Sequence, residues 1–184
     1  MSSEDSPSSS DVATTIVEAY PALSRFFTGK VPTSEVHDLV QDTVTVFLEK
    51  DPSTMDHPRR FLFGIGRNKL LQHFAIRRGE PFDSQNVSVR QLATTIGSRL
   101  AQRTTVLDAL RELPLDQQMA LELRYGEGFK LTEVAEAMDK SLAQAKRYLR
   151  DGVDTLRAQV GDAQPAEGAP DPVLERLSDE YKKS

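Results

Sequence analysis

Through most of this chain the apolar residues recur at intervals of three and four, and Pro or Gly breaks the pattern at short intervals. This spacing places apolar side chains along one face of an α-helix, and no segment shows the strict alternation of a half-buried β-strand. Cysteine is absent, so no disulfide framework can hold the chain together. An all-α fold is therefore predicted, with short helices that are held by packing alone.

The first part of the chain is predicted to form a small helical domain over residues 12–78. Residues 1–11 are rich in Ser and acids and are expected to be disordered. A break with two prolines follows Lys50 and is expected to form a loop as far as Pro58. The three expected helices run over residues 12–27 with an interruption at Pro21, from an N-cap at Thr33 or Ser34 up to the break, and over residues 59–78.

Two of these helices carry features that predict how they pack. The second helix is expected to turn one side inward, formed by Val36, Leu39, Val40, Val44, Phe47 and Leu48. The third is apolar more than halfway round, so it is expected to be central. Gly64 and Gly66 lower its helix propensity, which is explained if a neighbouring helix packs closely against them.

The second part of the chain is predicted to contain a helix-turn-helix. Residues 79–103 are polar and weakly periodic and are interpreted as a linker, and residues 104–160 as a second small helical domain, winged-helix-like in type. Its expected elements are a helix over 106–113, a helix from Leu115 to the glycines at 126 and 128, a helix capped by Thr132 that ends at Met138, a turn at Asp139 and Lys140, and a helix capped by Ser141 with Gln144 in a capping box. Residues 161–184 are expected to be a flexible tail, with a weak amphipathic helix through Val173, Leu174, Leu177 and Tyr181.

Charge is distributed unevenly along the chain. The net charge of −5 argues at first against a nucleic-acid partner. Yet residues 1–56 hold ten acids and three bases, residues 57–79 hold six bases and no acid, and residues 80–184 hold eighteen acids and fourteen bases. The adjacent acidic and basic blocks suggest two partners of opposite charge, although solvated faces of ordinary helices explain either block alone.

The last helix of the predicted helix-turn-helix carries the side chains that a DNA-reading helix requires. Lys146, Arg147 and Arg150 can reach phosphates and base edges in the major groove, and the Gln144 amide can read an adenine edge. The residues expected to face the core are Leu142, Ala145 and Leu149. An ordinary helical hairpin with a solvated basic face remains the alternative.

A second candidate site lies in the basic block, where cations and phenylalanines alternate. Such a mixture suits single-stranded DNA, which binds through phosphate neutralisation and base stacking. Each phenylalanine taken singly is more often a core residue than a stacking platform. The residues concerned are Arg59, Arg60, Arg67, Lys69, Arg77 and Arg78 with Phe61, Phe63 and Phe74.

Enzymatic activity is not expected. The three histidines, His37, His57 and His73, are scattered and have neither metal-ligand spacing nor an H-E-x-x-H pattern. Asp38 and Asp42 share one helix face, but an acidic protein-binding or solvated face explains them better than an acid/base pair. No segment approaches the length of a membrane-spanning helix and the N-terminus has no signal-peptide pattern, so a cytoplasmic protein without membrane insertion is expected.

Four motifs resemble those of bacterial sigma factors of the extracytoplasmic-function (ECF) type. Residues 37–43, HDLVQDT, are similar to the acidic signature of sigma region 2, and residues 61–68, FLFGIGRN, resemble its following helix. Residues 131–138, LTEVAEAM, are similar to the first helix of the region 4 helix-turn-helix, and residues 142–156 to its recognition helix. The motifs occur in the family's order and spacing, and nothing in the linker resembles the extra domain of larger sigma factors.

The resemblance covers roughly residues 12–78 and 104–157, and it implies a sigma factor that binds core RNA polymerase, recognises promoter DNA and helps to open it, with no catalytic residue, metal or cofactor of its own. The implied partners are the β′ clamp coiled coil and β flap of the polymerase, promoter DNA and an anti-sigma factor. The polymerase-binding face implied by the family is Asp38, Gln41, Asp42 and Thr45. The implied contacts to the minus-ten element are Lys50, Arg59, Arg60, Phe61, Arg67, Asn68, Lys69, His73, Arg77 and Arg78, and those to the minus-thirty-five element are Ser141, Gln144, Lys146, Arg147 and Arg150.

This chain departs from the family pattern at several positions. Phe61 stands where the family usually has Trp, and the recognition helix lacks the family's basic residues at 148, 151 and 153 and carries Asp151 instead. The glycine often found in the turn is replaced in the Asp139–Lys140 stretch, which is tolerable because Asp can adopt left-handed geometry. These changes put the minus-thirty-five contacts in doubt, Arg150 most of all.

Two alternatives to the sigma factor remain. A helix-turn-helix regulator that binds duplex DNA without polymerase explains residues 104–157 equally well, but leaves the acidic face and the basic, aromatic helix without a role. A sigma-like interaction module that has lost promoter reading is supported only by the depleted recognition helix.

Overall fold

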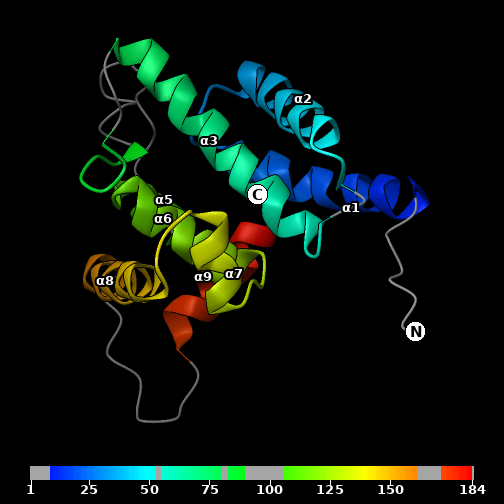
Figure 1. The fold of residues 1–184 in the computed structure, drawn as a ribbon. Helices are drawn as coiled ribbons and strands as arrows, with labels where there is room; N and C mark the ends of the chain where they lie inside the picture. The colour runs from blue at the N-terminus through cyan, green and yellow to red at the C-terminus, as the bar shows by residue number, and fades with distance from the viewer. Residues whose placement is uncertain (1–8, 53–54, 80–82, 90–105, 161–170, 184) are drawn as a thin grey trace, which may run out of the picture. The chain divides into compact units, whose positions relative to one another are not determined.

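The computed structural model describes residues 9–52, 55–79, 83–89, 106–160 and 171–183. These residues are helical apart from short connections and two isolated β-bridges, and no β-strand is found among them. The prediction of an all-α fold is therefore confirmed (Figure 1). The chain divides into two compact units, of which the first ends at Arg77 and the second begins at Arg78. No helix in the described ranges is long and apolar enough to cross a membrane.

The first unit is built from α1 (Ser9–Phe27), α2 (Thr33–Glu49) and most of α3 (Pro58–Arg78). The predicted interruption of the first helix at Pro21 is wrong, because α1 continues through this residue, whose ring lies on the exposed side. The predicted N-cap of the second helix is also wrong. Pro32 takes this position in an extended conformation, and its carbonyl accepts the Glu35 amide at 2.9 Å, so Thr33 already lies inside α2.

The core of the first unit lies where α3 meets α1 and α2. The rings of Phe26 on α1 and Phe63 on α3 meet edge to face with centroids 5.6 Å apart. Gly66 provides the close approach that its sequence position predicts, since a Cβ added there would lie 3.4 Å from the Phe27 ring and 3.5 Å from Leu23. One expectation fails at the end of α2: Leu48 is 51% exposed and takes no part in this core.

The second unit contains α5 (Val106–Glu112), α6 (Leu115–Leu121), the π-helical turn η2 (Glu122–Gly126), α7 (Leu131–Ala137), α8 (Leu142–Val160) and α9 (Pro172–Lys183). The long α8 is the centre of the unit and packs against α5, α6, α7 and α9. The helix that was predicted to end at the glycines does so, as α6 followed by η2. At Gly152 the backbone of α8 comes close to α6, since an added Cβ would lie 3.0 Å from Leu121.

The segment predicted as a linker has a structural role where the structure describes it. The first amides of a helix have no partner within the helix and need acceptors from elsewhere. Residues 83–89 supply two of them for α6: the Leu115 amide donates to the Val87 carbonyl at 3.1 Å and the Asp116 amide donates to the Ser84 carbonyl at 2.9 Å. This part of the predicted linker therefore belongs to the second unit, while residues 90–103 lie outside the described ranges.

The C-terminal helix is likewise part of the second unit. The predicted amphipathic helix is present as α9, which buries Val173, Leu177 and Tyr181. It packs against η2, α5 and α8. The prediction of a flexible tail over residues 161–184 is therefore wrong for α9, because its apolar side completes the core of the unit; residues 161–170 lie outside the described part of the chain.

Candidate functional site

The helix-turn-helix of the second unit is formed by α7, a tight turn and α8. Asp139 in the turn has φ of 52°, the left-handed geometry that its side chain was predicted to tolerate. Thr132 is not the cap of α7; the helix begins one residue earlier, and the Glu133 carboxylate accepts the Lys130 amide at 2.6 Å. The N-terminus of α7 is therefore capped by the glutamate in its first turn, as in one half of a capping box.

The predicted capping box at the start of α8 is confirmed. The backbone amide of Gln144 donates to Ser141 Oγ, and the Ser141 backbone amide donates to Gln144 Oε1, both at 3.2 Å. This arrangement fixes the first turn of α8 but occupies the side-chain oxygen of Gln144. Reading an adenine edge needs both the oxygen and the nitrogen of the amide, so only the nitrogen is available while the cap is intact.

The side chains of α8 divide into a buried and an exposed set. Ala145 and Leu149 are buried as predicted, whereas Leu142 is 49% exposed and does not face the core. Tyr148 also lies on the buried face of α8. Burial raises the pKa of its hydroxyl, the Asp116 carboxylate adds to this effect, and Arg147 opposes it. The aromatic residue in place of a basic one at 148 is thus a core residue of this unit.

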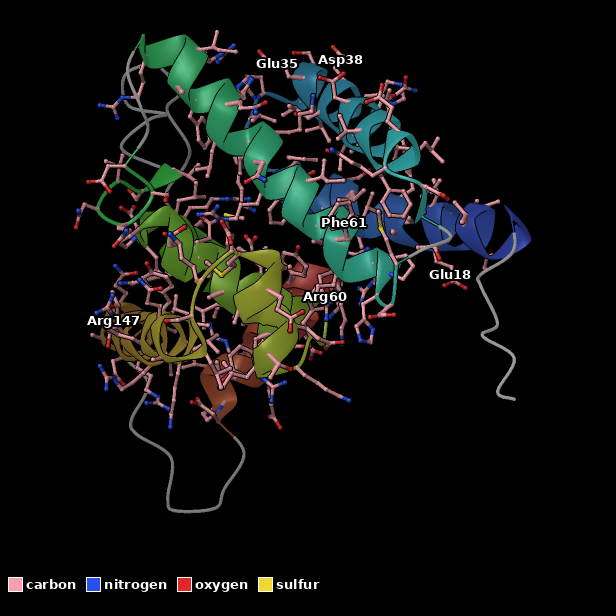
Figure 2. All side chains as sticks on the ribbon, viewed as in Figure 1. Glu18, Glu35, Asp38, Arg60, Phe61 and Arg147 are labelled. Atoms are coloured by element: carbon pink, nitrogen blue, oxygen red, sulfur yellow. The ribbon has the colours of Figure 1, made fainter. Side chains whose placement is uncertain are left out.

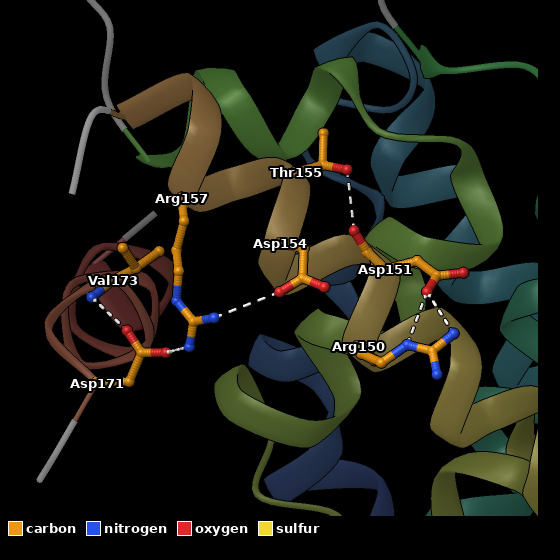
Figure 3. A network of polar contacts seen from close by, with 7 residues as sticks. All are labelled: Arg150, Asp151, Asp154, Thr155, Arg157, Asp171 and Val173. Atoms are coloured by element: carbon orange, nitrogen blue, oxygen red, sulfur yellow. Dashed lines mark hydrogen bonds and ion pairs between the residues drawn. The ribbon is translucent and has the colours of Figure 1, made fainter. Parts of the chain in front are cut away.

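The three predicted cations of α8 differ in their surroundings. Lys146 and Arg147 are exposed, and Figure 2 shows Arg147 on α8. The Arg147 guanidinium lies 5.8 Å from the centroid of the Tyr148 ring. Arg150 is also exposed, but its Nε and Nη2 donate to Asp151 Oδ1 at 3.1 and 2.9 Å (Figure 3). A guanidinium fork that already holds a carboxylate is less available to a phosphate or a guanine. The exposed, unclamped cations of the predicted DNA-reading set are therefore Lys146 and Arg147.

In the first unit, α2 presents the predicted polar face to solvent. Asp38, Gln41, Asp42 and Thr45 are all exposed and follow the i, i+3, i+4, i+7 spacing of one helix side. Asp38 points outward from α2 (Figure 2). Gln41 is anchored by His37, whose other ring nitrogen lies 2.8 Å from the Tyr20 hydroxyl of α1. The contact between Tyr20 of α1 and His37 therefore helps to fix the position of Gln41 on this face.

The acidic and basic blocks of the sequence meet in space. Lys69 of α3 lies 3.6 Å from the Asp42 carboxylate of α2. Glu35 of α2 lies 2.5 Å from Nη2 of Arg77 and 3.2 Å from Nε2 of His73. Three residues predicted to contact DNA therefore also join α3 to α2, a role that the sequence did not indicate for Lys69, His73 or Arg77.

The other residues that were predicted to contact the minus-ten element differ in their exposure. Arg67 is 6% exposed, because it falls on the same face as Phe63, Leu70 and Phe74, and its predicted contact to DNA is not possible with the side chain in this position. Phe63 and Phe74 are core residues, but Phe61 is 40% exposed (Figure 2). The other predicted residues that lie exposed are Lys50, Arg59, Asn68, Arg77 and Arg78, whereas Arg60, Lys69 and His73 are half-buried.

Acid is expected to destabilise the first unit through His73. Burial lowers the pKa of His73 below its ordinary value of 6.5; the Glu35 carboxylate opposes this effect and the Arg77 guanidinium adds to it. The imidazole of His73 therefore binds a proton more tightly in the unfolded chain than in the native one. For this reason the free energy of unfolding should be level above about pH 7 and fall as the pH drops below the pKa of His73 in the unfolded chain.

Urea denaturation followed by circular dichroism at about pH 7.5, 6.5 and 5.5 measures this dependence. His73→Gln should flatten the part of the pH dependence that His73 causes, since Gln keeps a polar side chain but does not titrate. Identical slopes for the parent protein and the variant would show that other groups, such as exposed carboxylates, cause the loss.

No group of three or more His, Asp or Glu side chains that could hold a metal ion is found among the residues that the structure describes. The candidate site consists of the polar face of α2, the exposed Phe61 of α3 and the exposed cations of α8.

Comparisons with known proteins agree with this description. Residues 103–156 match a family model described as Sigma-70, region 4. No curated protein matches the chain in sequence. Among solved structures, the fold is similar to that of the sigma factor RpoE from Bartonella quintana, solved in complex with the anti-sigma factor NepR. The two chains are 21% identical, with a TM-score of 0.63 over 84% of this chain and 99% of the other.

The predicted resemblance to sigma factors is thus confirmed in sequence over residues 103–156 and in fold over most of the chain. Two features of the site had escaped the sequence-based prediction. Glu35 had not been predicted among the functional residues, and only its distance from Arg77 in space reveals its role. The pairing of Arg150 with Asp151 could have been suspected from their adjacency, but not its geometry.

Proposed function

We propose that this chain is a sigma factor of the ECF type, which binds core RNA polymerase, directs it to promoters and helps to open the DNA without catalysis of its own. The observation that carries the proposal is the extent of the fold similarity: it spans 99% of a sigma factor chain and 84% of this one. A duplex-binding regulator needs only the helix-turn-helix, so the alternative leaves the first unit without a role. Action in the cytoplasm, together with the polymerase, would follow from this function.

The first unit is proposed to bind the polymerase through the polar face of α2. Asp38 and Asp42 are exposed acids on this face, and Gln41 and Thr45 lie beside them. The proposed target is the basic coiled coil of the β′ clamp. Complementary charge of this kind speeds and orients docking more than it adds affinity.

The first unit is also proposed to hold the melted minus-ten strand. Phe61 is exposed, and Asn68 lies seven residues further along α3, on the same side of the helix. A base unstacked from the duplex can stack on an exposed aromatic ring while nearby cations neutralise its phosphates. Arg67 is left out of this proposal because it is buried.

The second unit is proposed to place α8 in the major groove of the minus-thirty-five element. Lys146 and Arg147 are the main contacts in this proposal, and Ser141 with the nitrogen of Gln144 lies at the end of α8 that enters the groove. The β flap of the polymerase is a second proposed partner of this unit. An anti-sigma factor is also proposed as a partner, since the similar sigma factor from Bartonella quintana was solved with one.

The test is reconstitution of the full chain with core polymerase and promoter DNA that contains a pre-melted bubble. We expect a stable holoenzyme that initiates transcription, and a Phe61→Ala holoenzyme whose affinity for the bubble falls by about 5- to 150-fold, the 1 to 3 kcal/mol of one stacked base. Ile76→Ala is the matched control, because this apolar side chain of α3 is 81% exposed and has no proposed contact.

The other functions predict different outcomes of this experiment. A chain that binds duplex DNA but not polymerase is a helix-turn-helix regulator. A chain that binds polymerase but never initiates is an interaction module. Equal loss of bubble binding in Phe61→Ala and Ile76→Ala would remove Phe61 from the site.

A further inference from the structure

The C-terminal helix α9 is held in the second unit through a single stripe of side chains. Val173, Leu177 and Tyr181 are spaced by four residues and are buried, whereas the side chains between them are exposed or half-buried. The stripe packs against η2, α5 and α8. This is the geometry of an amphipathic helix seated in a groove of a partner, with anchors at i, i+4 and i+8.

The groove is shaped for an aromatic ring at its far end. An added Cβ on Gly126, the last residue of η2, would lie 2.6 Å from Cε1 of Tyr181 and still closer to Cδ1 of the same ring. The ring therefore rests directly on the backbone of η2. Any side chain larger than hydrogen at this position would close this end of the groove.

At its other end, the groove binds an acidic residue, Asp171, which precedes α9. Asp171 accepts a hydrogen bond from Nη2 of Arg157 through one carboxylate oxygen, and from the Val173 amide at 3.1 Å through the other (Figure 3). Arg157 also contacts Asp154 of α8 at 3.4 Å. The cation belongs to the groove and the acid to the helix that occupies it, so charge sets the direction in which a helix can bind.

The covalent connection to α9 has the composition of a tether. Residues 161–170, GDAQPAEGAP, join α8 to α9 and contain no apolar residue larger than Ala or Pro. A helix attached by such a segment competes with a free helix through its local concentration and not through additional contacts.

We propose that the groove beneath α9 is a binding site for an amphipathic helix of a partner protein, and that α9 occupies it as an exchangeable competitor. The partner helix carries an acidic residue before its first turn, apolar residues at i and i+4, and an aromatic residue at i+8. Arg157 lies seven residues beyond Arg150 on α8, and Lys146 and Arg147 stay exposed with α9 in place. The partner and DNA therefore use different side chains, and the inference goes beyond the proposed promoter function without depending on it.

The test uses the full chain and a fluorescent peptide of residues 170–184. In Leu177→Asp the tethered helix should leave the groove, because a carboxylate cannot replace a buried leucine. The peptide should then bind this variant at least about tenfold more tightly than it binds the parent protein, in which the tether holds α9 at an effective concentration of about millimolar. Anisotropy measures both affinities, and neither polymerase nor DNA is needed.

Two controls define what the groove recognises. A peptide with unrelated Ala, Glu and Lys residues that keeps only the four anchors at positions 171, 173, 177 and 181 should compete with the native peptide. Adding Gly126→Ala to Leu177→Asp should abolish binding of both peptides. If only the native peptide binds, the site is specific for α9 and the proposed partner class is wrong.

Asp171→Asn covers the case in which Leu177→Asp fails to fold. This change weakens the link to Arg157 without burying a new charge, and it should raise peptide affinity by a smaller factor. Loss of helical structure in Leu177→Asp with no gain for Asp171→Asn would mean that α9 is a permanent part of the core. Dimers of the parent protein in light scattering, with α9 exchanged between copies, would also overturn the proposal.

Discussion

Alanine at both Lys146 and Arg147 should remove most of the affinity of this chain for duplex DNA that carries its minus-thirty-five element. The two side chains are the exposed cations of α8 that no carboxylate of the described helix clamps. Each is worth about 1 to 3 kcal/mol if it contacts a base edge through two hydrogen bonds, and less if it contacts a phosphate. Titration of the duplex with holoenzyme at fixed salt, followed by anisotropy, measures the loss.

Arg150→Ala is the matched control for this double variant. It removes one cation from the same face of α8, but from a guanidinium that already holds Asp151 at 2.9 Å. We expect a much smaller loss of affinity than for either Lys146→Ala or Arg147→Ala. If Arg150→Ala has the largest effect, the pairing with Asp151 opens on binding and the assignment of the main contacts is wrong.

Lysine at both Asp38 and Asp42 should slow the association of the chain with core polymerase by about tenfold or more at low salt. The change reverses two exposed charges on the face proposed to meet a basic surface. The substitution of Asp42 also places a second cation beside Lys69, but the lost pair joins a half-buried lysine to an exposed carboxylate over 3.6 Å and is worth little to stability. Stopped-flow or surface binding at two ionic strengths measures the effect, which should shrink at high salt because ions screen exposed charges.

Glu18→Lys with Asp56→Lys is the control for this variant. Both residues are exposed acids of the first unit, and the change in net charge is the same. This control should associate at nearly the parental rate, since neither side chain belongs to the proposed face. Equal slowing in the two double variants would mean that overall charge, and not the face of α2, governs association.

The helices and their buried sides were the part of the structure that sequence could predict. Apolar spacing identified the helices of both units because burial of one side is what stabilises a short helix. The capping box of Ser141 and Gln144 and the left-handed Asp139 were predictable for the same reason, since each depends on residues within a few positions. Local chemistry decides these features, so a local pattern reveals them.

The errors arise where packing against a distant part of the chain determines whether a side chain is buried or exposed. Leu48 and Leu142 lie at apolar positions near the ends of amphipathic helices, where the described elements leave about half of each side chain exposed. Arg67 was placed among the DNA contacts by residue type and by the family resemblance, yet its position in the helix directs it inward. The tail prediction failed because α9 depends on a groove formed by α5, η2 and α8, which no property of residues 172–183 discloses.

The candidate site was predicted in part. The exposed face of α2 follows from helical spacing, and so do the exposed positions of α8. The pairing of Glu35 with His73 and Arg77 does not, because Glu35 and Arg77 stand 42 positions apart in the chain. Linear charge blocks show only that opposite charges are present, whereas the fold decides how far they neutralise one another.

Under the proposed function, the pairing of Arg150 with its neighbour Asp151 lowers the affinity of α8 for promoter DNA. A protein that displaces fewer counterions from DNA binds less tightly and loses less of its affinity as salt rises. Replacing Asp151 by a neutral residue would release a third cation to the duplex although residue 151 itself need never touch a base. On this proposal, the affinity for promoters can evolve at a position outside the DNA-reading surface, leaving the preferred sequence unchanged.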